Sequence, residues 1–256
     1  MTNDIRITRA DRVLRIQLNR PDKKNALTGA MYDAMREAIA GSNDDADVRV
    51  LFIHGLPDCF TAGNDLAEFQ DLARMIRERP AMKFLETIST AVKPIVAAVN
   101  GSAVGIGTTL LLHCDLAYAG QGAKFQLPFA SLGLCPEGSS SYALARMAGH
   151  VQAAELLMLG ERFSAERALA IGLVNAVLPD AELMAHAEGK VAQLAAQPAA
   201  AIRATKALLR KWTAARVAEV LETESRLFGE RLASPEFGEA ARAFFEKRKP
   251  DFSRLA

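Results

Sequence analysis

The chain has 256 residues, half of them apolar and about a quarter charged, which is the composition of an ordinary globular protein. Its formal charge of +1 provides no overall field to attract nucleic acid or an acidic membrane surface, and no apolar run is long enough to span a bilayer. The three cysteines form no C-x-x-C pair and the first ten residues carry charges throughout, so we expect a reduced cytoplasmic protein without a signal peptide.

The N-terminal part of the chain alternates between predicted strands and helices. Alternating apolar and polar residues predict a strand at 14–18, after a shorter strand at 5–7. Thr28 can cap a helix that continues to Gly41. Further strands are predicted at 50–53, 94–99, 116–119 and 173–178, and further helices at 65–80 and 108–114. Strands that alternate with helices predict an α/β fold.

From residue 139 onward the sequence is mostly helical. Alanine-rich amphipathic stretches predict helices at 150–160, 164–171, 181–196, 199–211, 214–232 and 235–248. We therefore expect an α/β core over residues 1–195 that holds the active site, followed by a helical region over residues 196–256. No low-complexity linker separates the two parts.

Two segments share one design, in which a predicted strand leads through a tight glycine-containing loop into a helix start. They are residues 60–66 and 100–107. A helix N-terminus leaves backbone N–H groups unpaired, and two such groups that converge on one point form an oxyanion hole. Taken singly, each loop is more simply an ordinary turn with glycine where φ is positive. Neither carries a nucleotide-binding glycine pattern, and no H-E-x-x-H motif or Cys/His cluster predicts a metal site.

Taken together, several segments resemble the crotonase superfamily of enoyl-CoA hydratases and isomerases. In order and at the family's spacing, they are residues 19–27, 60–68, 93–115, 160–179 and 244–250. The resemblance implies a crotonase-like spiral of repeated β-β-α units with a helical C-terminal region. It also implies an acyl-CoA substrate, no separate cofactor because coenzyme A is part of the substrate, and a homotrimer or hexamer assembled through the C-terminal helices.

The resemblance further implies which residues form the site. It assigns the two oxyanion donors to the backbone N–H groups of Asn64 and Ile106, and it indicates Lys24 and Lys247 as contacts for the CoA phosphates. The other CoA contacts that it implies are Ala26, Asp65 and Leu66. Without the resemblance, the lysines would be read as part of solvated charge runs.

The catalytic base is predicted from a third segment. Family hydratases use two glutamates, at positions that here are Thr109 and Phe129, and neither side chain can act as a general base near neutral pH. Residues 132–142 instead resemble the L-G-x-x-P-E-G-x-S-S-Y segment of peroxisomal-type Δ3,Δ2-enoyl-CoA isomerases, in which the glutamate is the base. That glutamate is Glu137 here, and its apolar neighbours are expected to raise its pKa.

The sequence thus predicts an enzyme that moves a double bond in an enoyl-CoA, with Glu137 taking a proton from C2 and returning it to C4. From local sequence alone, Glu137 would be an acid in the first turn of a helix beginning near Ser139. Two alternatives remain open. One is an enoyl-CoA hydratase or another crotonase reaction, and the other is a non-catalytic acyl-CoA-binding or interaction module on the same fold.

Overall fold

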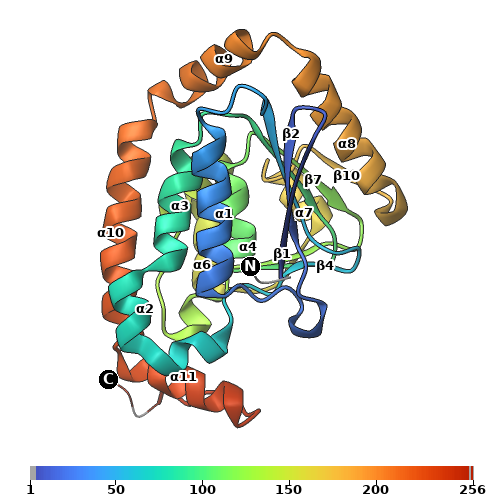
Figure 1. Ribbon diagram of the computed structural model, residues 1–256. Coiled ribbons are helices and arrows are strands. Elements are labelled where there is room, and N and C mark those ends of the chain that lie inside the picture. The colour runs from blue at the N-terminus through green and yellow to red at the C-terminus, as the bar shows by residue number, and fades with distance from the viewer. Residues whose placement is uncertain (1–3, 254, 256) are drawn as a thin grey trace.

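The computed structural model describes residues 4–253 and residue 255, and the strands within them form two sheets (Figure 1). The larger sheet has the order β1-β2-β3-β5-β7-β10, in which β1 runs antiparallel to β2 and the other neighbours run parallel. Its strands are β1 (Ile5–Ala10), β2 (Val13–Leu18), β3 (Val50–His54), β5 (Ile95–Val99), β7 (Leu116–Gly120) and β10 (Ala176–Leu178).

The smaller sheet has the order β4-β6-β8-β9 and is built from short strands. They are β4 (Cys59–Thr61), β6 (Ser102–Val104), β8 (Lys124–Gln126) and β9 (Phe163–Ser164). Along the chain β3 is followed by β4, β5 by β6 and β7 by β8, so each turn of the chain adds one strand to each sheet before a helical segment returns it. This arrangement confirms the predicted spiral of β-β-α units.

Helices lie on both faces of the larger sheet. The helices of the described chain are α1 (Gly29–Ser42), α2 (Leu72–Glu78), α3 (Pro80–Thr90), α4 (Ile106–Thr109), α5 (Ser140–Ala148), α6 (His150–Leu159), α7 (Ala165–Ala170), α8 (Asp180–Ala196), α9 (Ala199–Lys211), α10 (Ala214–Leu232) and α11 (Pro235–Phe245). Figure 1 shows α8 on one side of the sheet and α1 and α3 on the other. Along β3, Leu51 and Ile53 join the main core while Val50 and Phe52 pack toward α8, which explains why the strand is apolar on both faces.

Several elements differ from the sequence-based prediction. The prediction missed all four strands of the smaller sheet, because strands of two or three residues are too short to show a period. It took Pro80 as a helix end, whereas Pro80 is the first residue of α3, a position where proline loses no hydrogen bond. The helix predicted at 108–114 is instead the short α4 followed by a 3-10 turn, Leu110–His113.

The C-terminal helices share the main core with the rest of the chain. Helix α10 contributes Leu221, Phe228 and Leu232 to the same hydrophobic cluster as Leu51. This packing does not test the predicted boundary between an α/β core and a helical region at residue 195, which stays a prediction. In the described part of the chain, no helix combines the length and apolar character needed to cross a membrane.

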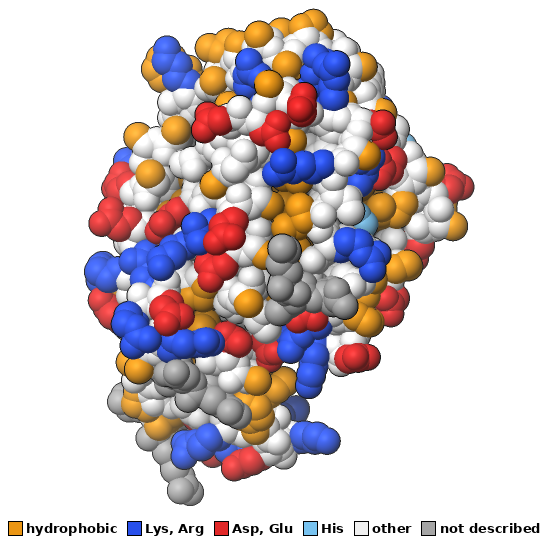
Figure 2. All heavy atoms as spheres, in the orientation of Figure 1, with side chains coloured by type: hydrophobic (Ala, Val, Ile, Leu, Met, Phe, Trp, Pro, Cys, Tyr) orange, Lys and Arg blue, Asp and Glu red, His pale blue; other side chains and the backbone are white. Residues whose placement is uncertain are grey.

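Helix α9 (Ala199–Lys211) is joined to the rest of the protein by the buried cation Lys206. Lys206, which is 6% exposed, donates from Nζ to the carbonyl of Lys93 (2.6 Å) and to the carboxylate of Asp115 (2.8 Å). Three large apolar side chains point outward instead, with exposed fractions of 65%, 76% and 84%: Leu208, Leu209 and Trp212. Figure 2 shows hydrophobic side chains along the upper edge of the molecule, where Figure 1 places α9. An apolar surface of this kind is typical of a protein contact.

Candidate active site

The first predicted loop is joined to the N-terminal segment 24–27 by backbone hydrogen bonds. The N–H of Ala62 donates to the carbonyl of Lys24 (2.9 Å), and that of Leu27 donates to the carbonyl of Gly63 (2.8 Å). The N–H of Asp65 then donates back to the carbonyl of Leu27 (2.9 Å). Two segments that lie far apart in the sequence, both predicted to contact CoA, are therefore side by side.

Arg20 holds the same two segments together through its side chain. Its guanidinium donates to the carbonyl of Ala26 (2.9 Å) and to the carboxylate of Asp65 (2.7 Å). The fully buried side-chain amide of Asn25 donates to two carbonyl groups of β4, each at 3.0 Å. Arg20 is thus occupied by a structural contact, which leaves the lysines of this loop as the cations available to a phosphate group.

Glycine permits the close approach of the first loop to the second. A Cβ atom on Gly63, where φ is +90°, would lie 2.8 Å from the carbonyl oxygen of Val104. A Cβ atom on Gly107 would lie 2.5 Å from the side-chain methyl of Thr61. Both contacts are closer than a side chain tolerates, so glycine at these positions allows the start of α4 to pack directly on the first loop.

The two predicted oxyanion donors meet at one cavity. Asn64 follows Gly63, and Ile106 is the first residue of α4. Both residues line a cavity of about 330 Å³ whose wall is mainly apolar. Among the described residues, neither of their backbone N–H groups donates to a protein acceptor. Two such donors at the wall of one apolar cavity are the arrangement needed to stabilise a developing negative charge.

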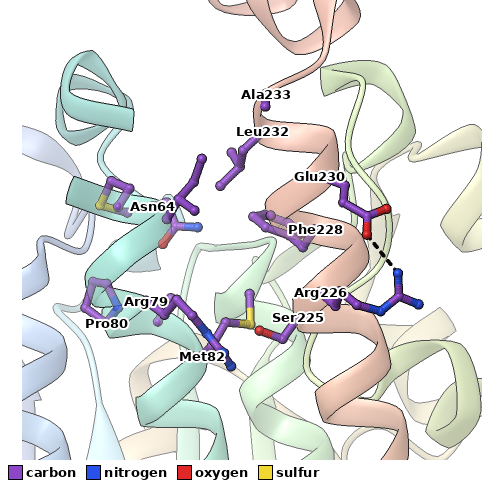
Figure 3. A pocket seen from close by; sticks show the side chains of 14 residues that line it. Asn64, Arg79, Pro80, Met82, Ser225, Arg226, Phe228, Glu230, Leu232 and Ala233 are labelled. Carbon is purple, nitrogen blue, oxygen red and sulfur yellow. Dashed lines mark hydrogen bonds and ion pairs between the residues drawn. The ribbon is translucent and has the colours of Figure 1, made fainter. Parts of the chain in front are cut away.

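A second cavity, of about 480 Å³, adjoins the first. It lies between α2–α3 and α10 (Figure 3) and is lined mainly by apolar side chains, among them Met75, Pro80, Met82 and Leu232. Asn64 and Phe228 line both cavities. An elongated ligand with its polar end in the smaller cavity and an apolar tail in the larger one would therefore pass beside Asn64.

Glu137 is a buried carboxylate beside α4. It is 2% exposed, and Oε1 accepts a hydrogen bond from the hydroxyl of Thr109, while Oε2 has no partner among the described residues. Burial raises the pKa of Glu137 to about 8, the Thr109 hydrogen bond opposes this rise, and the charge of Glu224 adds to it. The predicted rise is thus confirmed in direction. Thr109 follows Ile106 by three residues, so the carboxylate lies one helical turn from the second candidate donor.

Comparison with known proteins identifies the family. The model of the family described as "Enoyl-CoA hydratase/isomerase" matches residues 8–254. The chain belongs to the enoyl-CoA hydratase/isomerase family.

Named relatives within the family carry out different reactions. "Enoyl-CoA delta isomerase 2" of Rattus norvegicus is 35% identical over 96% of this chain. The matched part is only 64% of the length of the rat protein, and for the Homo sapiens protein of the same name it is 54%. "2,3-dehydroadipyl-CoA hydratase" of Escherichia coli is 33% identical over 98% of both chains. The crystal structure of an enoyl-CoA hydratase/isomerase from Pseudoalteromonas atlantica has a TM-score of 0.92 at 38% identity, covering 98% and 100% of the two chains. OdaA of Pseudomonas aeruginosa also reaches 0.92, at 45% identity and coverage of 95% and 99%.

Within this family fold, the loop that carries Glu137 is held from two sides. A ring nitrogen of His113 lies 2.9 Å from the carbonyl oxygen of Gly138. Burial lowers the pKa of His113 to about 4, so the neutral ring donates its N–H proton to that carbonyl. On the other side, the carboxylate of Glu224 accepts from the backbone N–H groups of Ser139 (2.6 Å) and Ser141 (3.0 Å). Glu224 therefore pairs with backbone N–H groups at the start of α5, where a negative charge is favourable.

The sequence analysis did not single out Glu224, although its pattern contained a signal. Leu221, Glu224 and Phe228 lie at helical spacing on one face of α10, so a carboxylate interrupts an apolar stripe. An acid at a core position calls for a specific partner, which here is the start of α5.

The remaining predicted residues are only partly brought together. Leu66 lines the 330 Å³ cavity, as does Phe129, whose ring forms an apolar wall where family hydratases carry a glutamate. Lys247 lies just beyond the end of α11 and is exposed. Phe244, three residues before Lys247, lines this cavity.

Proposed function

We propose that this protein is a Δ3,Δ2-enoyl-CoA isomerase, which moves a double bond in an acyl-CoA thioester through an enolate. The observation that carries the proposal is Glu137, a buried carboxylate that Thr109 holds at the end of α4 and whose Oε2 has no partner in the part of the chain that the structure describes. The isomerases named among the relatives support the same choice.

In the proposed reaction the thioester carbonyl oxygen accepts hydrogen bonds from the N–H groups of Asn64 and Ile106. Glu137 removes a proton from C2, and the electron pair moves onto the carbonyl oxygen to form the dienolate. The protonated Glu137 then returns its proton to C4, and the double bond forms between C2 and C3. One carboxylate suffices, because the base of the first half-reaction is the acid of the second.

Hydration is the second candidate, because the Escherichia coli relative that matches the whole chain is named a hydratase. Adding water across a double bond requires groups that activate the water and deliver a proton. Here the hydroxyl of Thr109 is bonded to Glu137, and Phe129 presents an apolar ring. The composition of the site therefore favours isomerisation.

We also propose that the CoA portion lies over the joined segments 24–27 and 62–66. Lys24 and Lys247 supply charge for its phosphates, and Ala26, Asp65 and Leu66 contact the adenosine part. The support is that backbone hydrogen bonds bring the two segments together beside the cavity, and that Arg20 is already engaged with Asp65.

Assembly of this chain into a homotrimer, or a hexamer of two trimers, is a further part of the proposal. Its support is the uncovered apolar surface of Leu208, Leu209 and Trp212 at the end of α9. Burying such side chains against another copy removes apolar area from water, which is the main favourable term in association.

The experiment that tests the proposed activity offers purified protein a 3-enoyl-CoA and a 2-enoyl-CoA in parallel. We expect conversion of the 3-enoyl-CoA to the 2-enoyl isomer, with slow or absent hydration of the 2-enoyl-CoA. Fast hydration without isomerisation would establish the second candidate. Binding of CoA with no turnover of either compound would indicate the non-catalytic module.

A further inference from the structure

A tyrosine from α1 reaches the first loop of the site. The hydroxyl of Tyr32 donates to Oδ1 of the Asn64 side chain at 2.5 Å. Tyr32 is 1% exposed, and its ring packs against that of Phe84, with centroids 5.6 Å apart. The position of the phenol is therefore set by the core, and the hydrogen bond ties Asn64 to that fixed point.

This hydrogen bond determines which way the Asn64 amide faces. Because Oδ1 accepts the phenol proton, the donating Nδ2 end lies away from Tyr32, and Asn64 lines both cavities at their junction. Among the described residues, Nδ2 donates to no protein acceptor. Figure 3 shows Asn64 and Phe228 on opposite sides of the larger cavity, with the amide in its wall. This side-chain donor of Asn64 is therefore available to a bound ligand.

The phenol keeps its proton at any working pH. Burial first, and the charge of Glu137 second, raise the pKa of Tyr32 well above its ordinary value of 10. Tyr32 therefore acts as a permanent hydrogen-bond donor to the side chain of Asn64.

We propose that the side-chain amide of Asn64 is a third donor to the enolate oxygen, and that Tyr32 is the positioning residue that orients it. This inference rests on the proposed function in one respect, namely that an enolate forms between Asn64 and Ile106. A donor fixed before the reaction stabilises the charge without reorganising as the charge develops. A free amide would rotate among several orientations and lose part of that benefit.

The test compares Tyr32→Phe, Asn64→Ala and the double variant. Tyr32→Phe removes one oxygen and keeps the ring packing, and Asn64→Ala keeps the backbone N–H while removing the side chain. Tyr118→Phe is the matched control, because Tyr118 is also buried but lies in the separate cluster against α8. The readouts are kcat and KM on a 3-enoyl-CoA, and the ultraviolet absorbance of the enolate of bound acetoacetyl-CoA.

We expect Tyr32→Phe to lower kcat by roughly 10-fold, the effect of one net hydrogen bond, with KM nearly unchanged. Asn64→Ala is expected to lower kcat by roughly 100-fold, the lower end for loss of one oxyanion donor. The double variant should match Asn64→Ala, because Tyr32 acts only through Asn64. Tyr118→Phe should match wild type in both readouts. The absorbance of the bound enolate should fall in the same order as kcat.

Two results would overturn the inference. One is a Tyr32→Phe protein that is less stable but retains wild-type kcat and enolate absorbance, which would make the bond purely structural. The other is a double variant whose loss is the product of the two single losses. Acetoacetyl-CoA forms its enolate without any proton transfer to C4, so this arm separates the two claims. If wild type does not convert 3-enoyl-CoA but the enolate absorbance of bound acetoacetyl-CoA is still lower in Tyr32→Phe and Asn64→Ala than in wild type, the inference holds and the isomerase assignment fails.

Discussion

Replacing Glu137 with glutamine should stabilise the protein at alkaline pH. Burial raises the pKa of Glu137 from 4.5 to about 8, so between these values the folded state holds a proton that the unfolded chain releases. The stability that this proton provides is fully present below pH 4.5 and is lost as the pH rises through 8. The difference of about 3.5 pKa units corresponds to about 5 kcal/mol, of which about 4 kcal/mol falls between pH 5 and pH 9.

The assay is denaturant unfolding of wild type and Glu137→Gln at pH 5, 7 and 9. Protein concentration must be the same throughout, because association would couple stability to concentration. The variant's free energy of unfolding, relative to wild type, should rise by about 4 kcal/mol from pH 5 to pH 9, since the glutamine does not titrate. The matched control is Glu222→Gln, which alters an exposed carboxylate on α10. A difference between Glu137→Gln and wild type that does not change with pH would refute the reasoning.

Three further predictions follow from the site and the surface. Thr109→Val removes the hydrogen bond that favours the charged form of Glu137, so the rise of kcat with pH should move to higher pH in a pH–rate profile. Lys24→Ala and Lys247→Ala should each weaken CoA binding by roughly 2- to 5-fold and reduce its salt dependence, measured by calorimetry at two salt concentrations. Trp212→Ala should shift the assembly toward smaller species in light scattering, because it removes the most exposed large apolar side chain of the α9 surface.

Each of these has a contradicting outcome. An unchanged or lower midpoint in Thr109→Val would mean that the threonine does not influence the base. Unaltered CoA affinity in both lysine variants would mean that other groups hold the phosphates. A wild-type protein that is monomeric at micromolar concentration would remove the reason for the tryptophan experiment and the trimer proposal with it.

The long elements of the fold were predictable because they carry strong periodicity and clear caps. Thr28 does accept a hydrogen bond from the N–H of Met31 at the start of α1, as its position suggested. The smaller sheet was not predictable in the same way, since its strands are short and are held by pairing with distant segments. The spiral of β-β-α units came from the resemblance and not from periodicity.

For the site, the sequence could indicate residues but not their partners. Asn64, Ile106 and Glu137 were found through motif resemblance, and the structure adds that the carboxylate is buried, with Thr109 and Glu224 as the polar groups that further influence its pKa. Those partners come from other helices, so no local pattern joins them to Glu137. Tyr32 was missed for the same reason: within α1 it reads as a core residue, and only the folded chain places its hydroxyl against Asn64.

The central claim is that Glu137 is the base that moves the proton, and one comparison tests it most directly. Turnover of a 3-enoyl-CoA is measured for wild type and Glu137→Gln, with CoA binding measured on the same samples. The account predicts that the variant binds CoA as wild type does and that its turnover rate is lower by about 10²–10⁴-fold, the usual cost of removing a general base. Turnover within a few-fold of wild type would contradict it, because the proton would then be carried by another residue.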